Sequence, residues 1–384
     1  MSLSDSKSQN IVIESAEERE LLVGLAKRTD AEALRIKRYL AMPDLSRTLG
    51  SPIKELVDRA LKAQILINFD DVKFPEILDL SIAFDLFDYP PNHPVRSRSD
   101  TYYPDDNHIL RTMTTNMWYY YVNQPDIKTK LDQGLAVGSV SYGKVYRKDE
   151  IDRHHMNVFH QLDGWFIVPK TERVIMSDDL QKVLIDVAHA LFGSDIKYRF
   201  NSDTFPYTDP SLEMEVEING RWIEVLGCGI VKEKVLDNLG VKGYNGWAFG
   251  FGLERLAIVS MDLPDIRLLW SQDPRVTKQL KLGQKYVEVS KYPPITRDIS
   301  FVVSSDFVPN NYFDLIRDLG GDLVEQVELL DKYENAEKFG EGKTSYTYRI
   351  IYRSNERTLT TEEIDPIQDK IYSETESQFN AELR

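Results

Sequence analysis

Residues 159–165, FHQLDGW, have the side chains of a strand whose one face suits a ligand. Because side chains alternate along a strand, this face carries Phe159, Gln161, Asp163 and Trp165. A solvated strand has no reason to align a ring, an amide, a carboxylate and an indole. The amide and the carboxylate can receive an ammonium group, and a phenylalanine ring suits an adenine ring. The pattern therefore predicts a ligand-binding face.

A charged segment, GKVYRKDEIDRHHMNVFHQLDG, contains the entry to this strand. Arg147 lies where an earlier strand enters the charged loop, and a planar, permanently charged guanidinium suits a phosphate. His154, His155 and His160 follow closely, but their spacings fit no standard zinc motif and no cysteine supports them. We therefore expect phosphate binding near this loop, and no histidine metal site.

The segment EMEVEINGRWIEVLG predicts a β-hairpin, because Asn219-Gly220 between two alternating runs is typical of a type I′ turn. With two residues in the turn, Glu215 pairs directly with Glu224. The other expected pairs are Ile218 with Arg221 and Val216 with Ile223, and the expected apolar face is Met214, Val216, Ile223 and Val225. Two carboxylates in register repel each other unless a cation lies between them. Nucleotide-bound Mg²⁺ is the obvious candidate, since it binds carboxylates and phosphates; the alternatives are another register, or glutamates that splay into water.

This hairpin favours an antiparallel sheet over a doubly wound nucleotide fold. Residues 250–255, GFGLER, begin like a dinucleotide-binding fingerprint but have Arg255 where the third glycine belongs. The sequence GxxxxGK[ST] does not occur. We therefore expect neither a dehydrogenase-like nor a kinase-like phosphate loop.

Several segments, in order along the chain, resemble one enzyme family. Residues 143–164 are similar to motif 2 of class II aminoacyl-tRNA synthetases, and residues 246–258, GWAFGFGLERLAI, to motif 3. Together with HPVRSRSDTYY, ILRTMTTNMW, FPYTDPSLEMEVE and WIEVLGCG, they resemble phenylalanyl-tRNA synthetase. The segments KYPPITRDISF, GGDLVEQVELLDKYE and SYTYRIIYRSNERTLTTEEI resemble the ferredoxin-like anticodon-binding domain of that family. Both parts in one short chain match the single-chain mitochondrial type better than the two-subunit types.

The resemblance implies a role for individual residues in binding ATP, Mg²⁺ and phenylalanine. Arg147 and Arg255 are implied to be catalytic, because they contact the triphosphate. The implied ATP-binding residues are Arg147, His155, Phe159, Glu224 and Arg255. The implied amino-acid-binding residues are Thr114, Thr115, Gln161, Asp163, Phe205, Tyr207, Gly227, Gly229, Ala248 and Phe249. Glu215 and Glu224 are the expected Mg²⁺ ligands.

Within this set, Gln161, Asp163 and Thr115 are expected to hold the amino group of phenylalanine. Phe205 and Tyr207 are expected to flank its ring, and Ala248 and Phe249 to lie near the end of the pocket. Gly227 and Gly229 are expected to let the backbone approach the substrate closely.

The elements that position these residues define an α+β chain: a class II antiparallel-sheet catalytic core followed by a ferredoxin-like anticodon-binding domain. We expect an N-terminal helical extension over 1–48, with helices that begin after Ser15 and Ser51, and a catalytic domain over 49–270. A polar linker is expected over 271–291 and the anticodon-binding domain over 292–384. In that last domain, Arg297, Arg349 and Arg353 are weak candidates for tRNA contacts.

Composition limits the classes of protein that remain. The chain has 384 residues, of which 42% are hydrophobic, so it is long enough to form two domains. Cys228 is its single cysteine, which excludes both a disulfide framework and a cysteine-based zinc site. A formal net charge of −15 argues against a generic nucleic-acid binder. No apolar run is long enough to span a membrane, and the acidic N-terminus is unlike a transit peptide. The resemblance nevertheless favours the mitochondrial matrix over the cytoplasm, and a monomer bound to tRNA(Phe).

Three departures from the family pattern concern the amino acid that is bound. Met113, Thr114 and Thr115 stand where histidine, threonine and serine are usual, and Asp163 stands where glutamate is usual. Tyr207 replaces a common phenylalanine, which adds a hydroxyl near the ligand ring. Phenylalanine remains the expected substrate. The alternatives are another aromatic amino acid such as tyrosine, or a non-catalytic tRNA-binding or regulatory paralogue.

Overall fold

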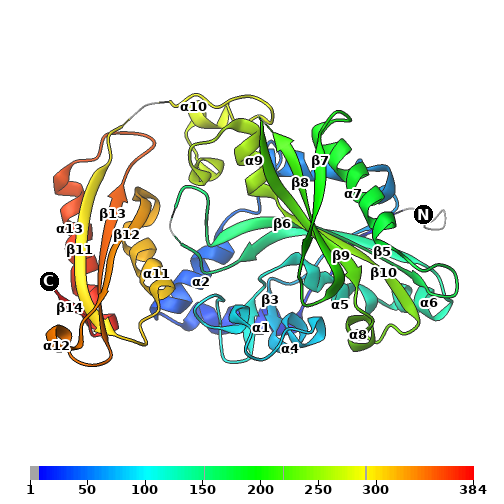
Figure 1. The fold of residues 1–384 in the computed structure, drawn as a ribbon, viewed down its shortest axis with the longest axis horizontal. Helices are drawn as coiled ribbons and strands as arrows, with labels where there is room; N and C mark the ends of the chain where they lie inside the picture. Colours follow the sequence, from blue (N-terminus) through cyan, green and yellow to red (C-terminus); the bar gives the residue numbers. More distant parts are fainter. Residues whose placement is uncertain (1–7, 151, 219, 290–291) are drawn as a thin grey trace. The chain divides into compact units, whose positions relative to one another are not determined.

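The computed structural model describes residues 8–150, 152–218, 220–289 and 292–384, which form two compact units (Figure 1). The first unit consists of residues up to Tyr146 together with Val158–Met261. The second consists of Arg147–Asn157 and Asp262–Arg384. The segment 147–157, which joins two strands of the first unit, thus groups with the C-terminal part of the chain.

An eight-stranded, mostly antiparallel sheet organises the first unit. Its strands, in spatial order, are β1 (Asn10–Val12), β2 (Asp70–Lys73), β5 (Val137–Tyr146), β6 (Val158–Pro169), β10 (Tyr244–Gly252), β9 (Arg221–Val231), β8 (Thr208–Ile218) and β7 (Tyr198–Asp203). Among the described strands of this sheet, only the β1–β2 and β2–β5 pairs are parallel. The antiparallel core that the hairpin and the family resemblance predicted is therefore confirmed.

The other elements of this unit cover the sheet or connect its strands. The helices are α1 (Ala16–Lys27), α2 (Ala31–Ala41), α3 (Pro52–Ala60), α4 (Leu80–Ala83), α5 (Met117–Val122), α6 (Pro125–Asp132), α7 (Ser177–Phe192), α8 (Glu233–Asn238) and α9 (Leu253–Met261). A small sheet pairs β3 (Ile77–Asp79) with β4 (His108–Leu110). The 3₁₀ helices are η1 (Gln64–Leu66), η2 (Asp85–Phe87), η3 (Pro94–Arg96) and η4 (Thr114–Asn116).

The N-terminal segment confirms two predicted helix starts and corrects one expectation. The Ser15 hydroxyl accepts a hydrogen bond from the Glu18 amide, and the Ser51 hydroxyl accepts one from the Ile53 amide, so both serines cap helices. However, residues 10–12 form β1 and pair with β2. The segment 1–48 is therefore not purely helical, because it adds an edge strand to the large sheet.

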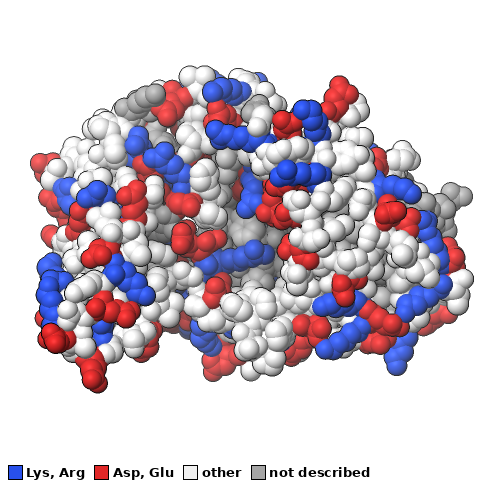
Figure 2. Space-filling view, in the orientation of Figure 1, with Lys and Arg blue, Asp and Glu red and all other residues white. Residues whose placement is uncertain are grey.

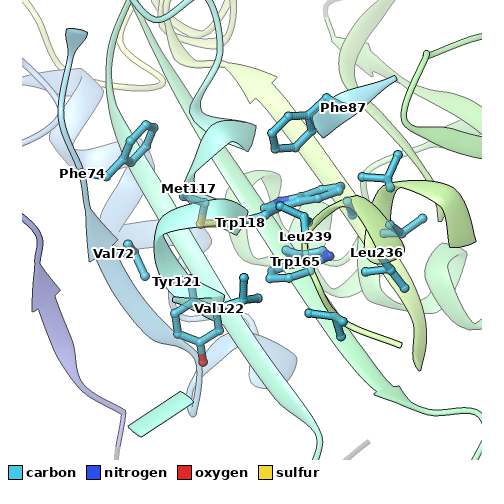
Figure 3. Close-up of a cluster of buried hydrophobic side chains, with 14 of the residues drawn as sticks. Val72, Phe74, Phe87, Met117, Trp118, Tyr121, Val122, Trp165, Leu236 and Leu239 are labelled. Carbon is cyan, nitrogen blue, oxygen red and sulfur yellow. The ribbon is translucent and has the colours of Figure 1, made fainter. Parts of the chain in front are cut away.

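Aromatic side chains fill the core beside the predicted ligand-binding face. Trp118 on α5 and Trp165 on β6 are fully buried and stack with ring centroids 4.9 Å apart and an interplanar angle of 7° (Figure 3). The ring centroid of Phe87 lies 5.4 Å from that of Trp118. Burying large rings of this kind contributes a major part of core stability. The stacking of Trp165 on Trp118 also fixes the position of β6 and of the side chains on the same face of that strand, Gln161 and Asp163.

A four-stranded sheet with the order β12-β13-β11-β14 organises the second unit. Its main elements, in chain order, are β11 (Ile295–Ser304), α11 (Pro309–Gly320), β12 (Val324–Glu334), β13 (Lys343–Tyr352), α13 (Thr361–Phe379) and β14 (Glu382–Leu383). Shorter helices are η5 (Ile266–Trp270), α10 (Pro274–Thr277), η6 (Gly321–Leu323) and α12 (Ala336–Phe339). Tyr312 of α11 and Ile371 of α13 pack with Tyr348 of β13 in one core. Element order and strand order are those of the ferredoxin-like fold that the sequence predicts.

No helix in the described part of the chain is both long enough and apolar enough to cross a membrane.

Candidate active site

The polar end of the predicted ligand-binding face is built by β6 and η4. Thr115 Oγ1 donates a hydrogen bond of 2.7 Å to Asp163 Oδ2, and the Thr114 amide donates one of 3.3 Å to Gln161 Oε1. Asp163 is only 3% exposed. A buried carboxylate needs such donors, because desolvation of an unpaired charge is costly. The fold thus brings together, as predicted, the side chains of Thr115, Gln161 and Asp163. Thr115 and Asp163 are 48 residues apart in sequence.

The neighbouring strand leaves room for this carboxylate. Gly250 of β10 pairs with Asp163, and a Cβ at Gly250 would lie 1.9 Å from Asp163 Oδ1. Any larger residue at this position would displace the carboxylate. The motif-3 glycine therefore has a local structural reason that is unrelated to a dinucleotide-binding loop.

The aromatic end of the face lies beyond Asp163 along β6. Ala248 of β10 pairs with Trp165, which is stacked on Trp118. Tyr207, in the loop between β7 and β8, is perpendicular to Trp118 at 6.0 Å and 89°. Phe205 lies parallel to Tyr207 at 6.0 Å and 16°. The face therefore runs from a carboxylate to a group of rings.

The position of Phe249 corrects one prediction. A Cβ at Gly164 would lie 2.5 Å from the Phe249 ring, so this ring covers the face of β6 opposite to Asp163. It stacks there between Trp247 and Phe251. Residues alternate along β10, so Ala248 and Phe249 cannot both point toward the ligand. Only Ala248 lies on the face of Asp163.

The two glycines of β9 also have a different local reason from the expected one. A Cβ at Gly227 would lie 2.6 Å from the Phe205 ring, and a Cβ at Gly229 would lie 2.4 Å from Thr208. Gly227 pairs with Gly250, and Gly229 pairs with Ala248. These glycines are therefore on the expected face. The space beside these glycines is filled by the side chains of Phe205 and Thr208, and not by the substrate as the resemblance implied.

The β8–β9 hairpin has the predicted register. Ile218 pairs with Arg221, Val216 with Ile223, and Glu215 with Glu224. Gly220 has a positive φ of 76°, while Asn219 lies outside the described residues. A bulge between Met214 and Glu215 makes Leu226, and not Val225, the partner of Met214. The expected apolar face is wrong at that one position, because a bulge inserts an extra residue into the strand.

Each carboxylate of the hairpin pair faces a guanidinium. Arg199 pairs with Glu215, and its hydrogen bond, together with one from Asn201, lowers the pKa of Glu215. Arg255 Nη1 donates a hydrogen bond of 3.2 Å to Glu224 Oε2, and both side chains are about half exposed. The two arginines thus reduce the repulsion between the two glutamates.

The chemistry of these donors is compatible with Mg²⁺ only when phosphates complete the shell. Within the described ranges, no three His, Cys, Asp or Glu side chains gather as a metal site. Mg²⁺ commonly uses one or two protein carboxylates plus substrate phosphates, and the cross-strand pair Glu215 and Glu224 supplies two. Arg255 beside Glu224 is suited to the same phosphates.

Arg147 and His155 belong to the segment that groups with the second unit. The Arg147 amide donates to the Asn157 carbonyl at 3.0 Å, which closes the loop between them. His155 Nδ1 lies 2.7 Å from Asp152 Oδ2. Burial raises the pKa of Asp152, but hydrogen bonds from the His154 amide and the His155 ring outweigh it, so the pKa is lowered overall. The loop holds His155 next to an ionised carboxylate.

The three arginines proposed for tRNA contact are each engaged by a carboxylate. Arg297 pairs with Asp365, Arg349 with Asp298, and Arg353 with Glu325. Arg349 lies between the buried Tyr348 and Ile350 on β13 and pairs in register with Asp298, so it is on the outer face of the sheet. Arg353 directly follows the last residue of β13, so its place on the same face stays a prediction. Arg297 pairs in register with the buried Ile350, so it lies on the other face. Charges of both signs are interspersed over the surface shown in Figure 2.

Sequence reasoning assigned no role to one buried polar pair. His160 and Glu254 are 0% and 4% exposed, and His160 Nδ1 lies 2.6 Å from Glu254 Oε1. A signal was available: Glu254 interrupts an apolar helix, and His160 lies on the inward face of β6. A buried charged residue almost always has a partner.

Comparison with known protein families agrees with this architecture. The family model described as tRNA synthetases class II core domain (F) matches residues 39–280. The ferredoxin-fold anticodon binding domain matches residues 290–384. Fold and matches together define a class II aminoacyl-tRNA synthetase core with an appended anticodon-binding domain.

Curated relatives specify the family further. The chain is 40% identical over 329 residues to the chloroplastic/mitochondrial phenylalanine–tRNA ligase of Arabidopsis thaliana, which covers 81% of this chain and 73% of that protein. It is 36% identical to the mitochondrial enzyme of Mus musculus, over 78% and 72% of the two chains. It is 30% identical to that of Saccharomyces cerevisiae, over 81% and 82%. The chain therefore belongs to the phenylalanine–tRNA ligase family.

Proposed function

We propose that this chain is a mitochondrial phenylalanine–tRNA ligase that activates phenylalanine with ATP and transfers it to the 3′-terminal ribose of tRNA(Phe). The observation that carries this proposal is the face of β6 and its neighbours. It places a buried carboxylate, Asp163, at one end and the rings of Trp118, Phe205 and Tyr207 at the other. An ammonium group and an aromatic side chain on one small molecule match those two ends.

At the polar end, Asp163 and Gln161 receive the ammonium group of phenylalanine. Thr115 holds the Asp163 carboxylate, and the Thr114 amide holds the Gln161 carbonyl, so both acceptors are oriented before the ligand binds. Preorganised acceptors reduce the entropy cost of binding. Ala248, which lies on the same face, limits the length of the aromatic side chain that fits.

The nucleotide lies toward the free end of the β8–β9 hairpin. Phe159 stacks on adenine, while Arg147, His155 and Arg255 contact the triphosphate. Glu224, with Glu215 across from it, is the proposed Mg²⁺ ligand. When bound between these carboxylates and the phosphates, Mg²⁺ would neutralise phosphate charge. The guanidinium groups supply fixed positive charge in geometries that suit phosphate oxygens.

Adenylate formation and transfer to tRNA require that the protein position the reactants and stabilise the charge on the phosphates. The carboxylate of phenylalanine attacks the α-phosphate of ATP, a new P–O bond forms, and pyrophosphate leaves with the electron pair of the broken bond. Arg147 and Arg255 stabilise the charge that spreads over the phosphate oxygens. A ribose hydroxyl at the 3′ end of the tRNA then attacks the adenylate and displaces AMP. Neither step needs a cysteine or histidine nucleophile.

The C-terminal unit is the proposed tRNA-binding part of a monomeric enzyme. Its fold is that of an anticodon-binding domain, its outer sheet face carries Arg349, and Arg353 follows the end of the same strand. Both are held by carboxylates, so any contact they make with RNA competes with an existing ion pair. We therefore assign them, and Arg297, a weak contribution.

Pyrophosphate exchange, screened over the twenty amino acids, tests the proposal. We expect exchange that depends on phenylalanine and, with tRNA(Phe) added, esterification of the tRNA. Faster exchange with tyrosine than with phenylalanine would overturn the assigned substrate. Tyrosine is the specific alternative because the Tyr207 hydroxyl lies near the expected ring. Exchange without tRNA charging would indicate an adenylate-forming ligase. Tight tRNA binding without exchange would indicate a regulatory paralogue.

A further inference from the structure

A buried hydrogen-bonded pair joins the two sequence segments that contain the proposed site residues. His160 is on β6 and Glu254 is in the first turn of α9, 94 residues apart. His160 Nδ1 lies 2.6 Å from Glu254 Oε1, and the His160 backbone amide lies 2.9 Å from both oxygens of the same carboxylate. The Glu254 carboxylate therefore accepts hydrogen bonds from both the backbone amide and the ring of His160.

The other nitrogen of the ring defines the protonation state. The Leu45 amide donates a hydrogen bond of 2.9 Å to His160 Nε2, so Nε2 is an acceptor and carries no hydrogen. Nδ1 must then carry the proton of the neutral ring, and it donates this proton to Glu254. The Glu254 carboxylate accepts from two N–H groups, which offsets the cost of burying its charge. The Asp44 carboxylate also lies 3.5 Å from Nε2, farther away than the Leu45 amide.

The neighbours of this pair in sequence are proposed site residues. Phe159 and Gln161 flank His160, and their side chains leave the opposite face of the strand. Arg255 follows Glu254 directly. A fixed bond between His160 and Glu254 therefore fixes the start of α9, and with it Arg255, relative to the strand that carries the adenine-stacking and ammonium-binding residues.

We propose that His160 and Glu254 are positioning residues for amino-acid activation, which hold the Arg255 guanidinium in register with the ligand-binding face of β6. This inference rests on the proposed function. Glu254 does not touch the substrates, and it acts through Arg255. Because a displacement of about 1 Å in a positioned group costs on the order of 100-fold in rate, a bond of this kind affects catalysis beyond its share of stability.

Two substitutions at His160 separate the two hydrogen bonds of the ring. His160→Asn places an amide N–H near the position of Nδ1, so it keeps a donor for Glu254 but loses the acceptor for Leu45. His160→Gln places an amide oxygen near the position of Nε2, so it keeps the acceptor for Leu45 but loses the donor for Glu254. The pair is matched in hydrogen bonding, because each variant deletes one of the two buried hydrogen bonds of the ring. His160→Asn leaves the larger void, so a greater loss of kcat in His160→Gln cannot come from lost packing.

The measurement is phenylalanine-dependent pyrophosphate exchange, with kcat and both KM values, alongside the thermal unfolding midpoint. We expect kcat of His160→Gln to fall about 100-fold, with KM for phenylalanine changed less than about threefold. His160→Asn should retain kcat within about fivefold of the wild type, although both variants lose similar thermal stability. Equal losses of kcat in the two variants would show a purely structural role and overturn the proposal.

A double variant tests whether the pair acts through Arg255. If it does, His160→Gln added to Arg255→Ala should lower kcat by less than about threefold beyond Arg255→Ala alone, because the group that it positions is already absent. Multiplicative losses would overturn the proposal. If His160→Gln does not fold, Glu254→Gln, in which one acceptor oxygen becomes a donor, replaces it in both comparisons with the same expected results. Absence of exchange in the wild type would instead refute the proposed function itself.

Discussion

Arg255 in the first unit and Arg349 in the second unit are both exposed arginines beside a carboxylate, but they hold it differently. Arg255 donates one hydrogen bond, of 3.2 Å, from Nη1 to Glu224. Arg349 donates two, both of 2.8 Å, from Nε and Nη2 to the two oxygens of Asp298. A two-pronged pair uses the geometry with which a guanidinium would otherwise bind phosphate. Arg255 therefore still has its two-pronged edge open toward a ligand, whereas Arg349 already uses such an edge on Asp298.

The same contrast distinguishes carboxylates in the two units. Glu325 is 4% exposed and is held by Arg153 at 2.6 Å and Arg353 at 2.7 Å. Asp163 is as deeply buried, and it accepts a hydrogen bond from the neutral hydroxyl of Thr115. A carboxylate paired with a hydroxyl can still attract an ammonium group, whereas one held by two arginines already has its counter-charges. The two arginines at Glu325 therefore stabilise the fold, which fits the proposal that Asp163 and not Glu325 receives an ammonium group.

The largest effect is expected for Arg255→Ala. Removing a fixed charge directed at phosphate should lower kcat of phenylalanine-dependent exchange by about 100- to 1000-fold. The unfolding midpoint should change little, because an exposed ion pair contributes little stability. The matched control is Arg349→Ala, which should leave exchange at wild-type levels. Equal effects of the two substitutions would break the comparison between the units.

The next largest effect is expected for Thr115→Val. It removes the hydroxyl that donates to Asp163, at a cost of about 1.5–3 kcal/mol for a hydrogen bond to a charged group. KM for phenylalanine should rise on the order of tenfold, and KM for ATP should stay constant. Thr114→Val is the control, since the Thr114 hydroxyl is buried and has no hydrogen-bond partner in the described structure. A rise in KM for phenylalanine in the control alone would reverse the assignment of these two threonines.

Within the second unit, Arg353→Ala should destabilise more than Arg349→Ala. Glu325 is buried and loses one of its two arginines, which should lower the unfolding free energy by about 1–3 kcal/mol. KM for tRNA should rise less than about threefold in either variant, because both arginines are engaged within the protein. Denaturant unfolding and tRNA charging measure the two quantities. A tenfold rise in KM for tRNA would show that the carboxylates release these arginines to RNA.

The Arg349 pair also predicts a dependence of stability on pH. The hydrogen bond from Arg349 lowers the pKa of Asp298, so the native state binds protons more weakly at this site than the unfolded chain. The contribution of the pair is therefore complete above the ordinary aspartate pKa of about 4 and disappears as pH falls through the lowered value. Arg349→Ala should narrow the stability difference between pH 6 and pH 3 relative to wild type. An unchanged difference would count against the pair.

The smallest effect is expected for Tyr207→Phe. Tyr207 lies among the rings of Phe87, Tyr89, Trp118 and Phe205, and this apolar surrounding is better suited to phenylalanine than to a para hydroxyl. The ratio of kcat/KM for phenylalanine to that for tyrosine should change less than about twofold. A wild-type preference for tyrosine that collapses in the variant would mean that the hydroxyl recognises the substrate, since a site built for a hydroxyl discriminates sharply.

Much of the local structure was predictable because its causes are local. The caps at Ser15 and Ser51, the alternation along β6 and the Glu215–Glu224 register each depend on a few adjacent residues. A serine that precedes a helix accepts from nearby amides, and a two-residue turn sets the pairing of the strands that it joins. The composition of the ligand-binding face follows from the same alternation, so Gln161 and Asp163 were identified before their partners were known.

What only the tertiary structure decided involves residues that are distant in sequence or a break in a regular pattern. The face taken by Phe249 depends on the register between β10 and β6, and Val225 lost its expected partner to a bulge. The addition of β1 beside β2 depends on two segments about 60 residues apart. The contact between His160 and Glu254 joins residues 94 positions apart in sequence, and it satisfies the requirement that a buried carboxylate be hydrogen-bonded.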